Sequence, residues 1–230
     1  MHTLKRRFEM KVANFRNGRA WDLAAAIPLI GLCLLASSGF AIMIGREWPP
    51  HLDGSTLLVM ASQVCSAAFL LFQAGLLCVR RLPIAKAPGL APKIVALIGA
   101  NFSFLILLIP KAPPAPMLAA ASSLLILIGT GCSIFTLTWL GKSFAILPQA
   151  RKLVTSGPYR FVRHPLYLAE QISAFGLSLQ YLQPWGVLIV SVGFLIQLPR
   201  MQFEEEILEA TYALYKDYKR RTARIIPLIY

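Results

Sequence analysis

The hydrophobic positions of this chain of 230 residues gather in six runs that short polar segments separate. A helix that crosses a membrane needs about 20 apolar residues to span a hydrocarbon core of about 30 Å. Four runs approach that length, and two shorter runs follow on either side of Gln183 and Pro184, which predict a tight hairpin. The predicted spans are residues 23–44, 57–79, 93–109, 117–140, 166–182 and 185–198. The pattern therefore predicts an all-α fold, a polytopic membrane bundle of about six transmembrane helices.

The basic residues are distributed very unevenly over the segments between these runs. If the N-terminus is cytoplasmic, 21 of the 23 Lys and Arg residues face the cytoplasm, and only Arg46 and Lys111 face the other side. Cytoplasmic loops of membrane proteins carry such an excess of Lys and Arg. The first run is longer than the apolar region of a cleaved signal peptide, about 7–15 residues, so we expect it to remain as an anchor. The charges predict an integral, multi-pass membrane protein with both termini in the cytoplasm.

The composition changes how the net charge is interpreted. Of the residues, 57% are hydrophobic and 14% are charged, whereas soluble domains average roughly 25% charged residues. The net charge of +13 would suggest nucleic acid in a soluble protein, but in an apolar chain it indicates loops beside an anionic leaflet. We therefore expect the lipid bilayer, and no nucleic acid, as a partner. The four cysteines form no CxxC motif, so no metal site is predicted.

We divide the single predicted membrane domain, residues 1–230, into three parts. Residues 1–22 form a basic cytoplasmic N-terminus, and residues 23–140 form four transmembrane helices. Residues 141–230 contain the helical hairpin and most of the residues able to carry chemistry, so this half is the predicted catalytic and cofactor-binding part.

The segment between the fourth and fifth spans combines Arg, His, Tyr, Pro and Gly. Pro165 suits the first turn of a helix, which places His164 at the helix N-terminus, beside unsatisfied backbone N–H groups and the positive end of the helix dipole. With Arg163 next to it, this arrangement predicts a site for a carboxylate or phosphate. The alternative is that Arg160 and Arg163 only contact lipid headgroups.

A second polar cluster, Glu204-Glu205-Glu206, follows the sixth span. Carboxylates are costly at membrane depth and are often functional there; the alternative is a solvated first helical turn, where acidic groups are favoured. We expect these residues to open a separate cytoplasmic amphipathic helix that continues through Tyr218. Its apolar stripe would follow three- and four-residue steps through Phe203, Ile207, Thr211, Leu214 and Tyr218.

Two features inside the spans add to this picture. Glu170, near the start of the fifth span, is the only acidic residue well inside any of the last five spans. It lines a cavity, accepts a bond from Arg163, or extends to the nearby membrane interface. Gly129-Thr130-Gly131 in the fourth span predicts a close approach of two helices.

The order and spacing of three motifs resemble the isoprenylcysteine carboxyl methyltransferase family, which is related to the membrane phospholipid N-methyltransferases. The motifs are the run from Gly157 to Tyr167, then Glu204-Glu205-x-x-Leu208, then a Tyr-x-x-Tyr-x-x-Arg-x-x-Arg-x-Ile-Pro tail. The resemblance covers about residues 140–227. Ala169-Glu170 departs from it, because many relatives have a Gly there.

The resemblance implies an S-adenosylmethionine-dependent methyltransferase that binds its cofactor between the last helices and the tail. It implies a cofactor site that is lined by Tyr159, His164, Pro165, Tyr167, Glu204 and Glu205. Arg163 and Glu205 are the candidate catalytic residues, with Glu205 as general base if the acceptor is an amine. An Arg/His helix start suits the carboxylate of the cofactor, paired glutamates suit its ammonium, and a Tyr face suits its sulfonium.

The methyl acceptor stays open between the carboxyl group of a prenylcysteine-like molecule and a lipid amine, and so does the choice of O- or N-methylation. A lipidic or prenylated acceptor would enter sideways between the helices. Two other functions are alternatives. One is an NADPH-dependent membrane reductase of the sterol-reductase type, which the ending Ile226-Pro-Leu-Ile-Tyr230 resembles, and the other is a non-catalytic membrane scaffold.

Overall fold

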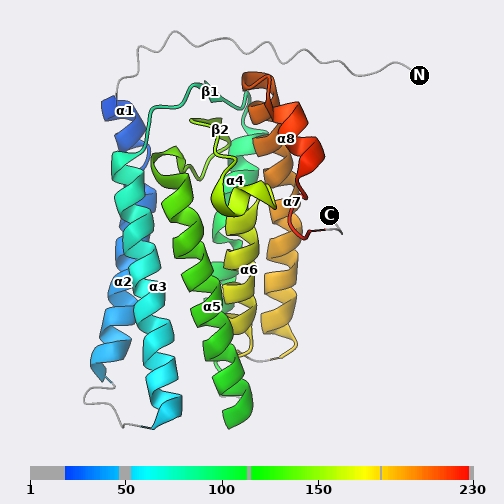
Figure 1. Ribbon diagram of the computed structural model, residues 1–230. Helices are drawn as coiled ribbons and strands as arrows, with labels where there is room; N and C mark the ends of the chain where they lie inside the picture. The colour runs from blue at the N-terminus through cyan, green and yellow to red at the C-terminus, as the bar shows by residue number, and fades with distance from the viewer. Residues whose placement is uncertain (1–18, 47–52, 113–114, 182, 228–230) are drawn as a thin grey trace.

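The computed structural model describes residues 19–46, 53–112, 115–181 and 183–227 (Figure 1). Most of the predicted basic N-terminus and the terminal Tyr230 lie outside the described residues. The described residues are mostly helical, at 74%, which agrees with the predicted all-α class.

Within the described ranges, four helices are long and apolar enough to cross a membrane. They are α2 (Ile27–Arg46), α3 (Gly54–Val79), α5 (Pro116–Leu140) and α7 (Trp185–Thr211). The other two predicted spans coincide with α4 (Ala91–Asn101), continued by the 3-10 helix η1 (Phe102–Leu108), and with α6 (Pro165–Ser178). The 14 residues of α6 extend about 21 Å at 1.5 Å per residue, which is less than the membrane core. A count of six crossings therefore stays a prediction.

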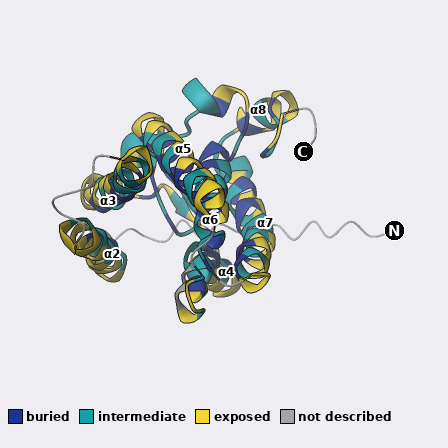
Figure 2. Ribbon diagram, turned by 90° about the horizontal axis from the view of Figure 1, so that it is seen from below, coloured by how far each residue is buried: buried dark blue, intermediate teal, exposed yellow. Residues whose placement is uncertain are grey.

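The long helices lie side by side as one bundle (Figures 1 and 2). Helix α2 packs on α3, α3 packs on α5, α5 packs on α6, and α4 packs on α7. The small elements gather at one end of the bundle, which we call the site end (Figure 1). They comprise α1 (Arg19–Ala24), β1 (Ala85–Lys86), η2 (Gly141–Ser143), β2 (Gln149–Ala150), η3 (Gly157–Arg160) and α8 (Tyr215–Arg221).

Large apolar side chains cover much of the outer surface of the bundle, as the exposed helix faces in Figure 2 indicate. Leu35 on α2 is 70% exposed and Leu195 on α7 is 60% exposed. Exposed apolar patches on this scale are rare on soluble monomers. They fit helices that face lipid, which agrees with the predicted integral membrane protein.

Helices α5 and α6 approach closely at Gly129. A Cβ atom added there would lie against the backbone nitrogen of Ser173 and 2.8 Å from the backbone oxygen of Ala169. At Gly131, by contrast, an added Cβ would meet nothing within 4 Å. The predicted close approach is confirmed at Gly129 and is wrong at Gly131, because the helix turns Gly131 away from α6.

A buried ion network joins α1 to the end of α3 and to the segment that follows α5. The Asp22 carboxylate forms ion pairs with two arginines: Oδ2 lies 2.8 Å from Arg80 Nε, and Oδ1 lies 3.2 Å from Arg151 Nη2. The Arg151 side chain has no exposed surface. Beside this network β1 pairs with β2 in antiparallel register. The segment before α4 therefore contains a short strand, β1, that connects it to the segment after α5. Arg80 and Arg151, which were counted as cytoplasmic charges in the predicted topology, also stabilise the site end.

The prediction of a separate amphipathic helix that begins at Glu204 is wrong. Helix α7 continues without a break through Glu204–Glu206 to Thr211, and the short α8 follows after three residues. Apart from Pro199, which lies inside α7, the residues after Leu198 are mostly good helix formers. The apolar stripe expected on one helix is thus divided between two.

We expect Gly129→Ala to destabilise the protein by about 1–3 kcal/mol, the usual cost of forcing extra atoms into a packed core. Thermal unfolding of the detergent-solubilised protein measures this as a lower melting temperature. Gly131→Ala is the matched control, and we expect it to be neutral or slightly stabilising because Ala favours helices over Gly. Equal destabilisation by the two substitutions would contradict the packing described at Gly129.

Candidate functional site

The core of the candidate site is the start of α6. Gly157 has a positive φ of 60°, and Gly157–Arg160 forms the 3-10 turn η3, which leads the chain directly into this helix. Pro165 occupies the first turn of α6 and His164 is its N-cap residue, although the His164 side chain makes no capping hydrogen bond. The structure therefore confirms a helix start near Pro165, one residue before the predicted span begins.

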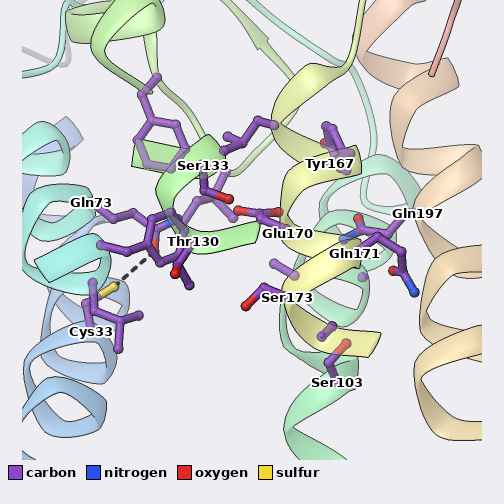
Figure 3. A pocket seen from close by; sticks show the side chains of 18 of the residues that line it. Cys33, Gln73, Ser103, Thr130, Ser133, Tyr167, Glu170, Gln171, Ser173 and Gln197 are labelled. Carbon is purple, nitrogen blue, oxygen red and sulfur yellow. Dashed lines mark hydrogen bonds between the residues drawn. The ribbon is translucent and has the colours of Figure 1, made fainter. Parts of the chain in front are cut away.

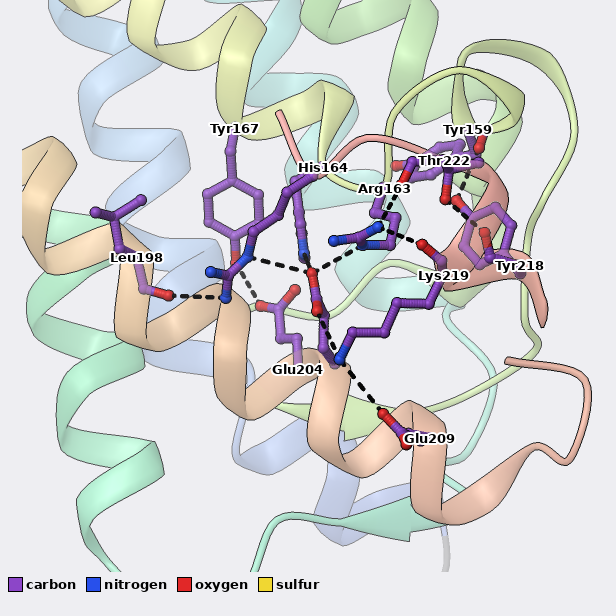
Figure 4. Close-up of polar contacts among 12 residues, drawn as sticks. Tyr159, Arg163, His164, Tyr167, Leu198, Glu204, Glu209, Tyr218, Lys219 and Thr222 are labelled. Atoms are coloured by element: carbon purple, nitrogen blue, oxygen red, sulfur yellow. Dashed lines mark hydrogen bonds and ion pairs between the residues drawn. The ribbon is translucent and has the colours of Figure 1, made fainter. Parts of the chain in front are cut away.

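The predicted anion site at this helix start is filled by a carboxylate of the protein itself. Glu205 Oε1 lies 3.0 Å from Arg163 Nε, 3.1 Å from His164 Nε2 and 3.2 Å from Arg224 Nε. Glu205 Oε2 lies 3.3 Å from Lys219 Nζ. The Glu205 side chain is only 5% exposed, so it is a buried anion that basic groups from three different segments surround (Figure 4).

The tail after α8 lies along the segment that leads into α6. The backbone N–H of Arg163 donates to the oxygen of Ala223 at 2.9 Å, and that of His164 donates to the oxygen of Arg224 at 3.0 Å. The Tyr218 hydroxyl donates to the carbonyl oxygen of Tyr159 at 2.7 Å. The ion pairs of Glu205 and this ladder together fix the tail against the helix start.

Glu204, one residue earlier on α7, faces a different set of groups. Its Oε1 accepts a hydrogen bond from the Tyr167 hydroxyl and lies 3.5 Å from Arg200 Nε. The guanidinium of Arg200 also lies over the Tyr167 ring, 4.8 Å from its centre. Among the described residues, Glu204 Oε2 makes no hydrogen bond, and the side chain is 22% exposed, so this carboxylate can still bind a ligand.

A cavity of about 680 Å³ extends from this cluster into the bundle. Its size falls in the range of roughly 300–1,000 Å³ that is usual for ligand sites. Towards the other end of the bundle the same cavity is lined by Phe40, Met43 and Val59 of α2 and α3. The cavity therefore joins a charged end to an apolar channel between helices.

Five of the predicted site residues line this cavity: Tyr159, Arg163, His164, Tyr167 and Glu204. The other two, Pro165 and Glu205, are not in its lining. Pro165 starts α6, and Glu205 holds Arg163 and His164 from behind. The structure therefore brings the predicted residues together: five of them line the cavity, and the other two support that lining.

The buried phenols of the site stay protonated near neutral pH. Burial, reinforced by the negative charge of Glu204, raises the pKa of Tyr159. Burial raises the pKa of Tyr218 to about 12, although Arg163 opposes this shift. Neither phenol is a base at neutral pH; the Tyr218 hydroxyl acts as a hydrogen-bond donor and the rings offer aromatic faces.

Sequence reasoning missed two contributors to the site. Arg200 is not among the predicted site residues, but it lines the cavity and is 6% exposed. Its i,i+4 spacing to Glu204 was the available signal. Tyr215, which also lines the cavity, was noted only as part of the aromatic and basic tail. Among the described residues, no group of three His, Cys, Asp or Glu side chains could hold a metal ion.

The fold and the site together define a helical membrane protein with a cavity between its helices, and the C-terminal half of the chain supplies the charged end of that cavity. Residues 116–214 match the family model of the phospholipid methyltransferases, and this domain belongs to the isoprenylcysteine carboxyl methyltransferase-like superfamily. The resemblance stated from the motifs, which spans about residues 140–227, is therefore confirmed over the part that the family model matches, up to residue 214.

Two curated proteins with metal-resistance names are also similar to the chain. One is the nickel-cobalt-cadmium resistance protein NccN of Alcaligenes xylosoxydans xylosoxydans, 30% identical over 80 residues, which are 34% of this chain and 38% of that protein. The other is the cobalt-zinc-cadmium resistance protein CzcN of Cupriavidus metallidurans, 29% identical over 106 residues, 41% of this chain and 49% of that protein. The matched parts thus span less than half of either relative.

We expect Glu205→Gln to destabilise the folded protein by about 3–5 kcal/mol, because breaking a buried ion pair leaves uncompensated charge behind. Thermal unfolding in detergent measures the loss, and limited proteolysis should show earlier cleavage between α8 and Pro227. Glu206→Gln is the control, since Glu206 is exposed and bonds only Gln202 among the described residues. If both variants unfolded at the wild-type temperature, Glu205 would not be the anchor of the tail.

Proposed function

We propose that the protein is an S-adenosylmethionine-dependent methyltransferase that acts on a lipidic acceptor. The observation that carries this proposal is the cavity itself, which is lined by Arg163, His164, Glu204 and the side chains of Tyr159 and Tyr167. The matched methyltransferase domain supports the reaction class.

The residues that line the charged end fit the cofactor chemically. S-adenosylmethionine would supply a methyl group activated by its positively charged sulfur. Arg163 uses Nε and Nη1 for Glu205 and for the backbone oxygens of Lys219 and Thr222, which leaves Nη2 to bind a carboxylate. Glu204 Oε2 would bind an ammonium by a charge-assisted hydrogen bond, and the faces of Tyr159 and Tyr167 would contact the sulfonium.

We propose that these side chains contribute mainly position and electrostatics. Methyl transfer needs the acceptor atom, the methyl group and the sulfur in one line, and enzymes gain much of their rate from such alignment. Glu205 fixes Arg163 and His164, and Arg200 fixes Glu204, so the polar groups are oriented before a ligand binds. With its charge balanced by four basic groups, Glu205 serves as a positioning residue in this scheme, and no general base is needed for a carboxylate acceptor.

The acceptor would reach the site through the apolar part of the cavity, and the cofactor would enter from the site end. We propose that the site end faces the cytoplasm, because Arg46 lies at the far end of α2 whereas Arg80, Arg151 and the basic α8 lie at the site end. The positive-inside rule then orients the bundle.

A nicotinamide reductase is the competing function. The match to the phospholipid methyltransferase family model favours methyl transfer over this function. The metal-resistance names of the two relatives describe those proteins and identify no reaction.

Isothermal titration calorimetry of the purified protein in detergent tests the proposal. We expect saturable binding of S-adenosylmethionine, which Glu204→Gln weakens about 10- to 100-fold because a hydrogen bond to a charged group contributes about 1.5–3 kcal/mol. His164→Ala should weaken it too, and Glu206→Gln should leave it unchanged. Binding of NADPH without binding of S-adenosylmethionine would contradict the proposal, and binding of neither would favour a scaffold.

A further inference from the structure

Glu170 is a carboxylate inside the bundle for which the description so far gives no role. It lies in the second turn of α6, about 8 Å along the helix from Pro165 at 1.5 Å per residue. Its side chain lines the cavity and points across it towards α5 (Figure 3). The neighbouring Ala169 packs at the Gly129 contact, so the backbone that presents Glu170 is held firmly.

The side chains that face Glu170 from α5 donate their hydroxyl hydrogens to backbone oxygens and form no hydrogen bond with the Glu170 carboxylate. Ser133 donates its hydroxyl hydrogen to the oxygen of Gly129 at 2.8 Å, and Thr130 donates its own to the oxygen of Ile126 at 2.6 Å. Among the described residues, Glu170 makes no hydrogen bond or ion pair. A buried or half-buried polar group without a partner is costly, so a ligand that brings hydrogen-bond donors would be favoured here.

Arg200 is the basic group whose charge acts on Glu170, but its hydrogen bonds go to other groups. It donates through Nη1 to Gln197 at 3.1 Å and through Nη2 to the oxygen of Ile146 at 3.0 Å. Its Nε faces Glu204 at 3.5 Å. Two carboxylates, Glu170 and Glu204, therefore share the charge of one guanidinium, and Glu170 receives no hydrogen bond from it.

The place of Glu170 between the two ends of the cavity indicates which ligand it meets. On one side lie Tyr167 and Glu204, the groups proposed above for the cofactor, and on the other lie the apolar side chains of α2 and α3. A molecule with an apolar tail between these helices would bring its head group to Glu170, next to the cofactor groups.

We propose that Glu170 determines acceptor specificity, by binding a head group that donates hydrogen bonds and carries positive charge, such as an alkyl ammonium, and by repelling a carboxylate. The inference rests on the proposed methyl transfer, for which it selects the amine class of acceptor over the carboxyl class. Glu170 acts by binding and positioning the head group, so its effect appears in affinity whether or not turnover occurs.

The test uses two soluble amphiphiles with the same tail, octylamine and octanoate, which carry opposite charges at neutral pH. Calorimetry of the full-length protein in detergent should show octylamine binding about 10-fold or more tightly than octanoate. Glu170→Gln keeps the shape of the side chain and should weaken octylamine binding about 10-fold, the change expected for one charge-assisted hydrogen bond. Glu170→Asp keeps the charge and should retain the preference for octylamine. Glu206→Gln, outside the cavity, should behave as wild type.

Titration of S-adenosylmethionine into the same samples separates this inference from the proposed function. We expect Glu170→Gln to bind the cofactor within about twofold of wild type, given that the proposed ammonium partner is Glu204. Wild-type preference for octanoate, or unchanged octylamine affinity in Glu170→Gln, would overturn the role of Glu170. Wild-type protein that binds octylamine but not S-adenosylmethionine would refute the methyl-transfer proposal alone.

Discussion

The buried carboxylate of Glu205 is the interaction on which the site end of this protein depends. A carboxylate that is 5% exposed is stable only when charged and hydrogen-bonding groups replace the water it has lost. Here those groups come from the start of α6, from α8 and from the tail. Glu205 therefore holds the start of α6, 42 residues earlier in the sequence, against α7. This contact positions Arg163 and His164 in the cavity wall.

The same constraint separates the two neighbouring glutamates into different roles. Both carboxylate oxygens of Glu205 are paired with basic groups. Glu204 instead contacts Tyr167 and Arg200 through Oε1, and its Oε2 is available to a ligand. Because both belong to one uninterrupted helix, α7, the position of Glu204 in the cavity is fixed by the anchoring of Glu205. Arg200, one turn earlier on α7, adds a second fixed contact to Glu204, and its charge also acts on Glu170.

Local physical rules made several parts of this arrangement predictable from the sequence. Apolar run length located the long helices, Pro165 marked the first residue of α6, and Gly129 marked a helix contact. Five residues that line the site were also predicted, because polar groups at a helix start and carboxylates near a membrane span are chemically unusual. The pairing of these groups was not predictable, because it depends on contacts between segments that are distant in sequence. Arg163 lies 42 residues from Glu205, and Arg151 lies 129 residues from Asp22. The extension of α7 was missed because polarity suggested a new helix where good helix formers simply continue the old one.

The central claim is that Glu205 and the tail shape a cavity that holds S-adenosylmethionine between the start of α6 and Glu204. An experimental structure of the full-length protein prepared with saturating S-adenosylmethionine, for example by cryo-electron microscopy with a bound antibody fragment, tests it most directly. The account predicts ligand density in contact with His164, Tyr159 and Glu204, with Glu205 still paired to Arg163. Density at another place, or a Glu205 side chain turned away from Arg163 to bind the ligand itself, would contradict it.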